Sequence, residues 1–348
     1  MSRGSLSLNE HHQVTDSEGN HAEVNAVVTN AESITYSDTL SPEEGNLNYA
    51  LGSVEAAQSV DVSNADLIKV SQSASNALLD KASSSIKIGT GSLSGYDGFA
   101  YADTSQVASG QSFDTATGLT VRTDEIASNH LGASNSFADI VNGGIAGYLP
   151  FMSAGAIASG DGGADNGVAT SYGALGGFSG DKVTVGSSAA SSDGSKTSDI
   201  KTTIKTGGSD FYLAGSGVNF MGPGVASLQL YDMMYGTNVK ITDTAFNAGN
   251  KASTSMEVKN GAFYNLKFVP ADVAQAGSIS GDPSSSDVFT GMYYAVGVSA
   301  DKLTLTASAT NALGVNAYQQ TVVPSPNAFF YNAADVFAGN PYVNQEQV

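Results

Sequence analysis

Four histidines are the residues of this chain whose chemistry would be easiest to recognise. Nucleophilic catalysis usually pairs a serine with a histidine base, yet three of the four, His11, His12 and His21, lie in the polar first 22 residues. The fourth is His130, and the sequence contains no Gly-x-Ser-x-Gly motif whose serine it could activate as a base. His11 and His12 are adjacent, so in a strand their side chains point to opposite faces. We therefore predict neither a histidine-based active site nor a histidine metal site.

Calcium is the ion for which the sequence offers the most plausible ligands. Asp161, Asp165 and Asn166 lie in a glycine-rich segment and carry the hard oxygen atoms that calcium prefers. The segment lacks the ordered acidic ladder and the closing bidentate glutamate of a calcium-binding loop. An ordinary turn stabilised by Asp and Asn side chains explains the same residues, and we favour this alternative. No other cofactor is predicted.

The carboxylates leave one enzymatic alternative open. The chain has 33 Asp and Glu residues, and two of them could be brought together by the fold for glycoside hydrolysis. Carbohydrate sites usually expose Trp, however, and this chain has none. The glycine motifs that bind phosphates are not completed anywhere either. We predict that the chain is not an enzyme, and we keep a secreted β-fold polysaccharide-degrading enzyme as a second alternative.

The elements that must position these residues are predicted from composition. Only 14% of residues are charged, against about a quarter in an average domain, and polarity comes instead from Ser, Thr, Asn and 40 Gly. These residue types have low helix propensity. We expect a mainly β fold with a few short helices, in which an antiparallel sandwich or barrel-like body carries extended N- and C-terminal arms.

Several segments can be assigned by their pattern. Helical spacing predicts helices over 64–81, 123–141 and 225–235. The dipeptide Asn260-Gly261, between alternating apolar runs, predicts a β-hairpin, and Asp193-Gly194 predicts a second one. Two similar runs, Val239 to Phe246 and Met256 to Phe263, suggest a parallel β-helix, but a solenoid needs at least three repeats. We favour an antiparallel sheet.

Four regions follow from composition along the chain. Residues 1–22 are polar and are expected to form an arm that is flexible or that orders against a partner. Residues 23–160 combine strands and helices, and residues 161–324 are β-rich. Residues 325–348 mix prolines with many Phe and Tyr residues, which predicts an aromatic C-terminal arm that packs on the body or on a neighbour.

The charge balance limits the partners. The net charge is −19, and no cluster of Lys and Arg is visible along the sequence, although nucleic-acid binding needs one. Attachment to anionic lipid is disfavoured for the same reason, and no apolar stretch is long enough to span a bilayer. The expected partners are copies of the chain and other structural subunits, without nucleic acid or membrane.

These inferences favour a structural function. The weakly charged β-rich body, the two arms and the lack of an apolar leader segment between Met1 and Asn20 predict a self-assembling virion component, such as a phage capsid, decoration or tail protein. The alternative is an extracellular filament, surface-layer or adhesin subunit. The expected location is accordingly the virion, or else the extracellular space or cell surface.

Overall fold

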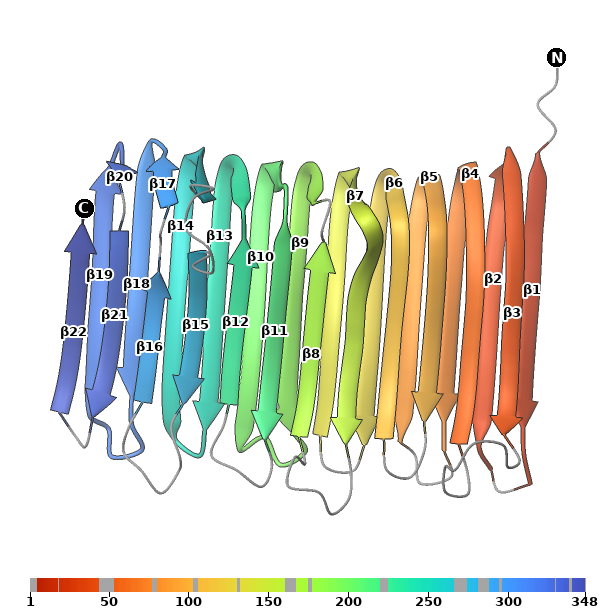
Figure 1. The fold of residues 1–348 in the computed structure, drawn as a ribbon, viewed down its shortest axis with the longest axis horizontal. Coiled ribbons are helices and arrows are strands. Elements are labelled where there is room, and N and C mark those ends of the chain that lie inside the picture. Colours follow the sequence, from red (N-terminus) through yellow and green to blue (C-terminus); the bar gives the residue numbers. More distant parts are fainter. Residues whose placement is uncertain are drawn as a thin grey trace.

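The fold is a long slab made of two layers of antiparallel strands (Figure 1). A computed structural model provides the coordinates. The residues it describes are 5–17, 19–43, 53–76, 80–102, 106–129, 132–159, 167–174, 177–219, 225–265, 274–280, 288–293, 296–328, 330–337 and 340–347. Within them all 22 strands belong to one hydrogen-bonded sheet, which folds over on itself and is not closed. The first and last strands, β1 and β22, lie at opposite ends of the slab.

Four long strands run through both layers and join them. They are β4 (Ser53–Ser75), β5 (Lys81–Ala102), β6 (Gln106–Asn129) and β7 (Gly132–Ser159). One half of each pairs in the first layer and the other half in the second, as the registers of β4 with β2 and with β3 show. Each of these strands thus crosses from one layer to the other at one long edge of the slab. Consecutive strands are joined at the opposite long edge.

The remaining strands extend the two layers. The first layer continues with β1 (Leu6–Thr15), β2 (His21–Ala31), β9 (Phe178–Ser191), β10 (Lys196–Ser209), β13 (Met233–Asn247), β14 (Asn250–Asn265), β18 (Lys302–Thr310) and β19 (Asn316–Pro324). Short ends of β10 and β14 cross into the second layer at Thr206 and Asn260. The second layer continues with β3 (Ser33–Glu43), β8 (Gly167–Ala174), β11 (Tyr212–Asn219), β12 (Val225–Tyr231), β15 (Ala274–Ser280), β16 (Val288–Tyr293), β21 (Phe330–Phe337) and β22 (Asn340–Gln347). Two short strands, β17 (Val296–Ser299) and β20 (Asn327–Ala328), pair near the fold-over edge.

The core lies between the layers and follows from the alternation of apolar and polar residues. Along β2, Val24, Ala26 and Val28 are fully buried while the residues between them are partly exposed. This is the period of two expected for a strand with one face covered. The alternation of buried and partly exposed residues thus gives this strand its inner face.

The chain turns between layers at corners built from asparagine and glycine. Asn142 has φ of 49°, in the left-handed region, which Asn tolerates better than most residues. Its side-chain amide donates a hydrogen bond to Asp181 Oδ2 at the adjacent corner, at 2.7 Å. A Cβ on Gly143 would lie 1.9 Å from the carbonyl oxygen of Ser179, so only glycine fits there. Equivalent positive φ angles occur at Asn30, Asn64, Thr90, Thr206, Asn260 and Ser325.

The predicted mainly β, antiparallel, sandwich-like fold is confirmed, but the predicted helices are wrong. The described parts of 64–81, 123–141 and 225–235 are all strands, and no helix occurs among the described residues. The Asp193-Gly194 hairpin is confirmed by the pairing of β9 with β10. Asn260-Gly261 is a corner inside β14 instead of a hairpin, because the chain continues there from the first layer into the second.

The predicted terminal arms also need correction where the structure describes them. Leu6–Thr15 forms β1, which pairs with β2 over its length, so most of residues 1–22 belongs to the body. At the other end, β21 pairs with β16 and β22 pairs with β21. The backbone of both terminal segments is therefore held by the sheet itself. Ordering of these segments against a partner stays a prediction.

Candidate interaction site

Lysine and arginine gather on the outer face of the first layer. Every basic residue that the structure describes lies on a strand segment of this layer. Lys69 lies directly opposite Lys87, and Lys87 lies opposite Arg122. We call the nine exposed basic residues in three adjacent rows of this face the basic band: Lys69, Lys87, Arg122, Lys182, Lys201, Lys205, Lys240, Lys259 and Lys302.

The band is incompletely neutralised within the molecule. The same rows contain only three acidic residues, Asp124, Asp139 and Glu257. Arg122 Nη2 lies 3.2 Å from Asp139 Oδ2, and Lys259 Nζ lies 3.8 Å from Glu257 Oε1. Among the described residues the other seven side chains of the band form no ion pair. Since like charges directly opposite each other destabilise a sheet, the uncompensated cations of the band repel one another.

The centre of the band is hollowed. An open hollow of about 430 Å³ has Arg122, Lys182 and Lys201 on its rim, together with Asp124 and Asp139. The ring of Phe137 also lines it and packs over Gly186, where a Cβ would come within 2.7 Å of the ring. Burial raises the pKa of Asp124, and hydrogen bonding from Asn135 and the charge of Arg122 oppose this shift. The hollow thus combines one aromatic ring with charged side chains of both signs.

The opposite face of the slab has the opposite charge. Glu55, Asp61, Asp97 and Asp114 are exposed on the outer side of the second layer, and the described part of this layer contains neither Lys nor Arg. Phe99 is 42% exposed on the same side, two residues from Asp97 along β5. An aromatic side chain this exposed is a candidate contact residue.

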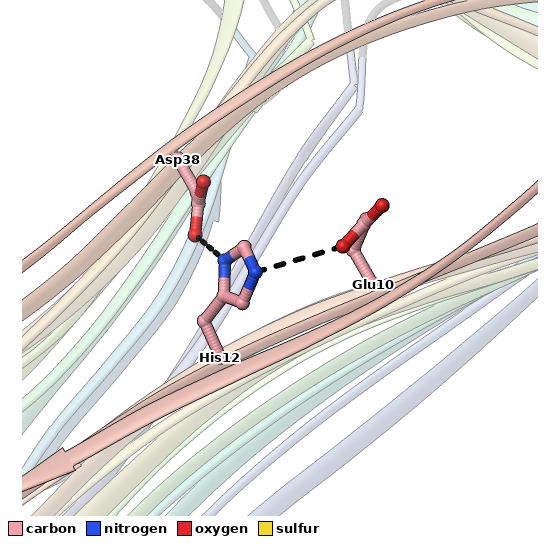
Figure 2. A network of polar contacts seen from close by, with 3 residues as sticks. All are labelled: Glu10, His12 and Asp38. Carbon is pink, nitrogen blue, oxygen red and sulfur yellow. Dashed lines mark hydrogen bonds and ion pairs between the residues drawn. The ribbon is translucent and has the colours of Figure 1, made fainter.

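A polar cluster joins the layers at the N-terminal end of the slab (Figure 2). His12 on β1 donates from Nδ1 to Asp38 Oδ2 on β3, at 2.6 Å, and its Nε2 lies 3.5 Å from Glu10 Oε2. The hydrogen bond and the charge of Asp38 raise the pKa of His12. Burial, followed by the charges of Asp38 and Glu10, raises the pKa of Tyr36 to about 12.

The histidine predictions can be compared directly with this cluster. His12 points toward Asp38 while His11 lies 3.4 Å from Glu23, so the adjacent rings do face opposite ways. Within the described residues no group of three or more His, Asp or Glu side chains is placed to hold a metal ion. His130 and the proposed calcium ligands Asp161, Asp165 and Asn166 lie outside the described residues.

Polar side chains also lie between the layers, where sequence patterns gave no hint of them. Glu125 is buried, and Ser136 Oγ donates a hydrogen bond to its Oε2 at 2.8 Å. Burial raises the pKa of Glu125 to about 8, although hydrogen bonds from Ser136 and Gln111 oppose the shift. Gln58 donates from Nε2 to Oε1 of the buried Gln72 at 2.7 Å. These contacts lie in the core and reach no surface site, and they leave the side-chain oxygens of Gln58 and Gln111 without a hydrogen-bond partner among the described residues.

The sequence prediction of no basic cluster was wrong in three dimensions. Lys69, Lys87 and Arg122 are far apart along the chain, and only the strand register brings them together. A lysine or arginine at an outward position of many successive strands was the available signal. It becomes readable only when the hairpins and corners are known.

Comparisons with known proteins add no relative. No protein-family model matches the chain, and no curated protein is significantly similar to it in sequence. No helix in the described part of the chain has the length and apolar character needed to cross a membrane.

Proposed function

We propose that this chain is a structural subunit that works by assembling with copies of itself. The observation that carries the proposal is that the slab is open at both ends. Each of the four terminal strands, β1, β3, β19 and β22, has a full-length partner on one side only. Such edges present unpaired backbone N–H and C=O groups, which template pairing with another chain.

The strand count supports addition of copies head to tail. Each layer contains twelve antiparallel segments, counted along the ladders from β1 to β19 and from β3 to β22. With an even number, β19 and β1 run in opposite directions, and so do β22 and β3. A copy displaced along the long axis therefore continues the antiparallel alternation in both layers at once.

The side chains at the C-terminal end fit such a contact. Tyr318 and Val322 on β19 are 59% and 52% exposed, and Tyr342 and Val343 on β22 are each 51% exposed. Exposed apolar residues on edge strands mark association sites. At the other end Leu6 on β1 is 48% exposed.

Two settings are proposed for the assembly. The sequence favours a virion component, and the open-ended slab fits equally a subunit of an extracellular filament or surface layer. Both use the same end-to-end contact between subunits, which is heterologous and does not close on itself.

Charged substitutions at the end test the proposal. Tyr318→Lys combined with Val322→Lys places two lysines on an edge strand, which discourages edge-to-edge pairing. We expect electron microscopy and light scattering to show linear assemblies for the wild-type chain and monomers for this variant. Leu119→Lys, at a corner in the middle of the slab and 56% exposed, is the control and should assemble normally. Equal assembly of both variants would contradict the proposal.

The enzymatic alternative rests on the carboxylates Asp124 and Asp139. Both carboxylates line the hollow of the basic band. Burial raises the pKa of Asp124, whereas Asp139 is paired with Arg122. In glycosidases, different environments of two carboxylates make one an acid and the other a base. Incubation with acidic and neutral polysaccharides tests it. Cleavage that is lost in Asp124→Asn would replace the structural proposal with a hydrolytic one.

A further inference from the structure

The two broad faces of the slab carry opposite charges. The basic band covers the outer face of the first layer, and the exposed acids Glu55, Asp61, Asp97 and Asp114 lie on the outer face of the second. Because these faces point away from each other, they cannot neutralise one another within a single molecule (Figure 1).

We propose that the basic face of one copy docks on the acidic face of a second copy, so that slabs stack along their shortest axis. This inference rests on the proposed function, since it names a second self-contact of the same structural subunit. It differs from the end-to-end contact in direction and in chemistry. The stacking contact uses charged side chains on sheet faces, and the end contact uses backbone groups and apolar side chains on edge strands.

The shapes of the two faces fit the proposal. The hollow on the basic face is lined by the ring of Phe137 and by the cations Arg122, Lys182 and Lys201. On the acidic face the ring of Phe99 lies over Gly110 of the neighbouring strand, 42% exposed and two residues from Asp97. Phe99 of one copy laid against Phe137 of the next would bury the exposed parts of two aromatic rings and bring Asp97 toward Arg122, Lys182 and Lys201.

The regular spacing of the strands allows charges on the two faces to lie opposite each other. The strand axes keep nearly the same orientation from one end of the slab to the other (Figure 1). Neighbouring strands in any sheet are about 4.8 Å apart. Both faces thus share one repeat, so rows of cations and rows of acids can meet over many strands. A single surface ion pair contributes little free energy to a contact, about 0–1 kcal/mol. Many such pairs across a whole face together contribute enough to hold two copies together.

A second copy fits the basic band better than a free polyanion does. The net charge of −19 repels an approaching polyanion at long range. A second copy carries that charge too, but it also brings its own basic band, and each new layer exposes the same pair of faces again. The contact is heterologous and therefore does not stop at a dimer.

Charge exchange between two variants is the test. Lys182→Glu/Lys201→Glu replaces two cations of the basic band with carboxylates, and Glu55→Lys/Asp97→Lys replaces two carboxylates of the acidic face with cations, so each variant alone places like charges opposite each other at the contact. We expect neither variant to stack alone, while an equal mixture stacks as the wild type does. Small-angle scattering and electron microscopy report the stack repeat, and circular dichroism checks that each variant is folded.

Salt and a matched control sharpen the result. Screening shortens the reach of charge from about 10 Å at 0.1 M to 3 Å at 1 M salt, so stacks should dissolve in 1 M NaCl while end-to-end strings persist. Lys81→Glu/Lys251→Glu makes the same charge change on the same face outside the basic band. We expect Lys182→Glu/Lys201→Glu to raise the concentration for half-maximal stacking roughly tenfold, which corresponds to about 1.4 kcal/mol. The control variant should raise this concentration much less.

Three outcomes would overturn the inference. Wild-type strings that never stack, or stacks that are unchanged in Lys182→Glu/Lys201→Glu, would reject the face contact and leave the proposed function standing. Binding of a sulfated or uronate polysaccharide by wild-type chains that do not stack would assign the band to a polyanion instead. A wild-type chain that stays monomeric at all salt concentrations would defeat both the proposed function and this inference.

Discussion

Glu125 illustrates how a single buried charge makes the stability of this fold depend on pH. Burial raises its pKa from 4.5 to about 8, so the folded chain holds a proton that the unfolded chain releases between these values. The free energy of unfolding therefore falls as the pH rises from about 4.5 through 8. The neutral Glu125→Gln variant can still accept the hydrogen bond from Ser136.

We expect Glu125→Gln to be more stable than the wild type at pH 9, on the order of a few kcal/mol, and nearly equal to it at pH 4.5. Urea unfolding at the two pH values measures the difference. The exposed Glu55→Gln is the control and should leave the wild-type pH dependence intact. A variant that retains the full pH dependence would show that Glu125 does not cause it.

His12 acts in the same direction at the N-terminal end. The hydrogen bond and charge of Asp38 raise its pKa above 6.5, so the stability that this contact contributes is complete below pH 6.5 and is lost as the pH rises through the higher folded value. We expect the thermal midpoint of His12→Gln to fall less than that of the wild type between pH 6 and pH 8.5. His11→Gln, which leaves the contact with Asp38 in place, should behave as the wild type does.

The corners are the elements on which the two-layered fold depends. Asn142 combines a left-handed backbone with a hydrogen bond to Asp181, and Gly143 allows the backbone of Ser179 to approach closely. Asn142→Ala should cost about 1–2 kcal/mol, because alanine tolerates a left-handed backbone less well than asparagine and cannot donate the hydrogen bond to Asp181. Gly143→Ala should cost about 3 kcal/mol or more, because the added carbon overlaps backbone atoms.

Urea unfolding measures these costs, and Asn142→Gly separates the two roles of the asparagine. Glycine keeps the left-handed backbone but removes the side-chain amide, so it should cost less than Asn142→Ala. If alanine were tolerated at both positions, the corners would not define the crossing between layers.

The elements also explain what the sequence could reveal. Alternation was visible in β2 because Val24, Ala26 and Val28 fill its buried positions. It was hidden in β4, where the buried series is Ile68, Val70 and Gln72. A polar residue on the inner face, satisfied by Gln58, breaks the apolar pattern, and the spacing around it then resembles that of a helix.

The two-layered arrangement of the whole slab could not be predicted from local sequence patterns. Composition and turn residues predicted an antiparallel β fold, yet the same Asn-Gly signal marks a hairpin in many proteins and a corner between layers at Asn260. The alignment of Lys69, Lys87 and Arg122 depends on the register in which β4, β5 and β6 pair. The basic band is therefore a property of the folded sheet, and it could be found only there.

End-to-end addition of copies is the central claim at this scale. Because the strands lie across the long axis of the slab, the spacing between neighbouring strands, about 4.8 Å, must run along the axis of any assembly that grows at the open ends. Assemblies of the wild-type chain, aligned by shear, can be examined by X-ray fibre diffraction. The account predicts a reflection near 4.8 Å on the meridian. Assemblies that place this reflection on the equator, or a chain that remains monomeric at every concentration, would contradict it.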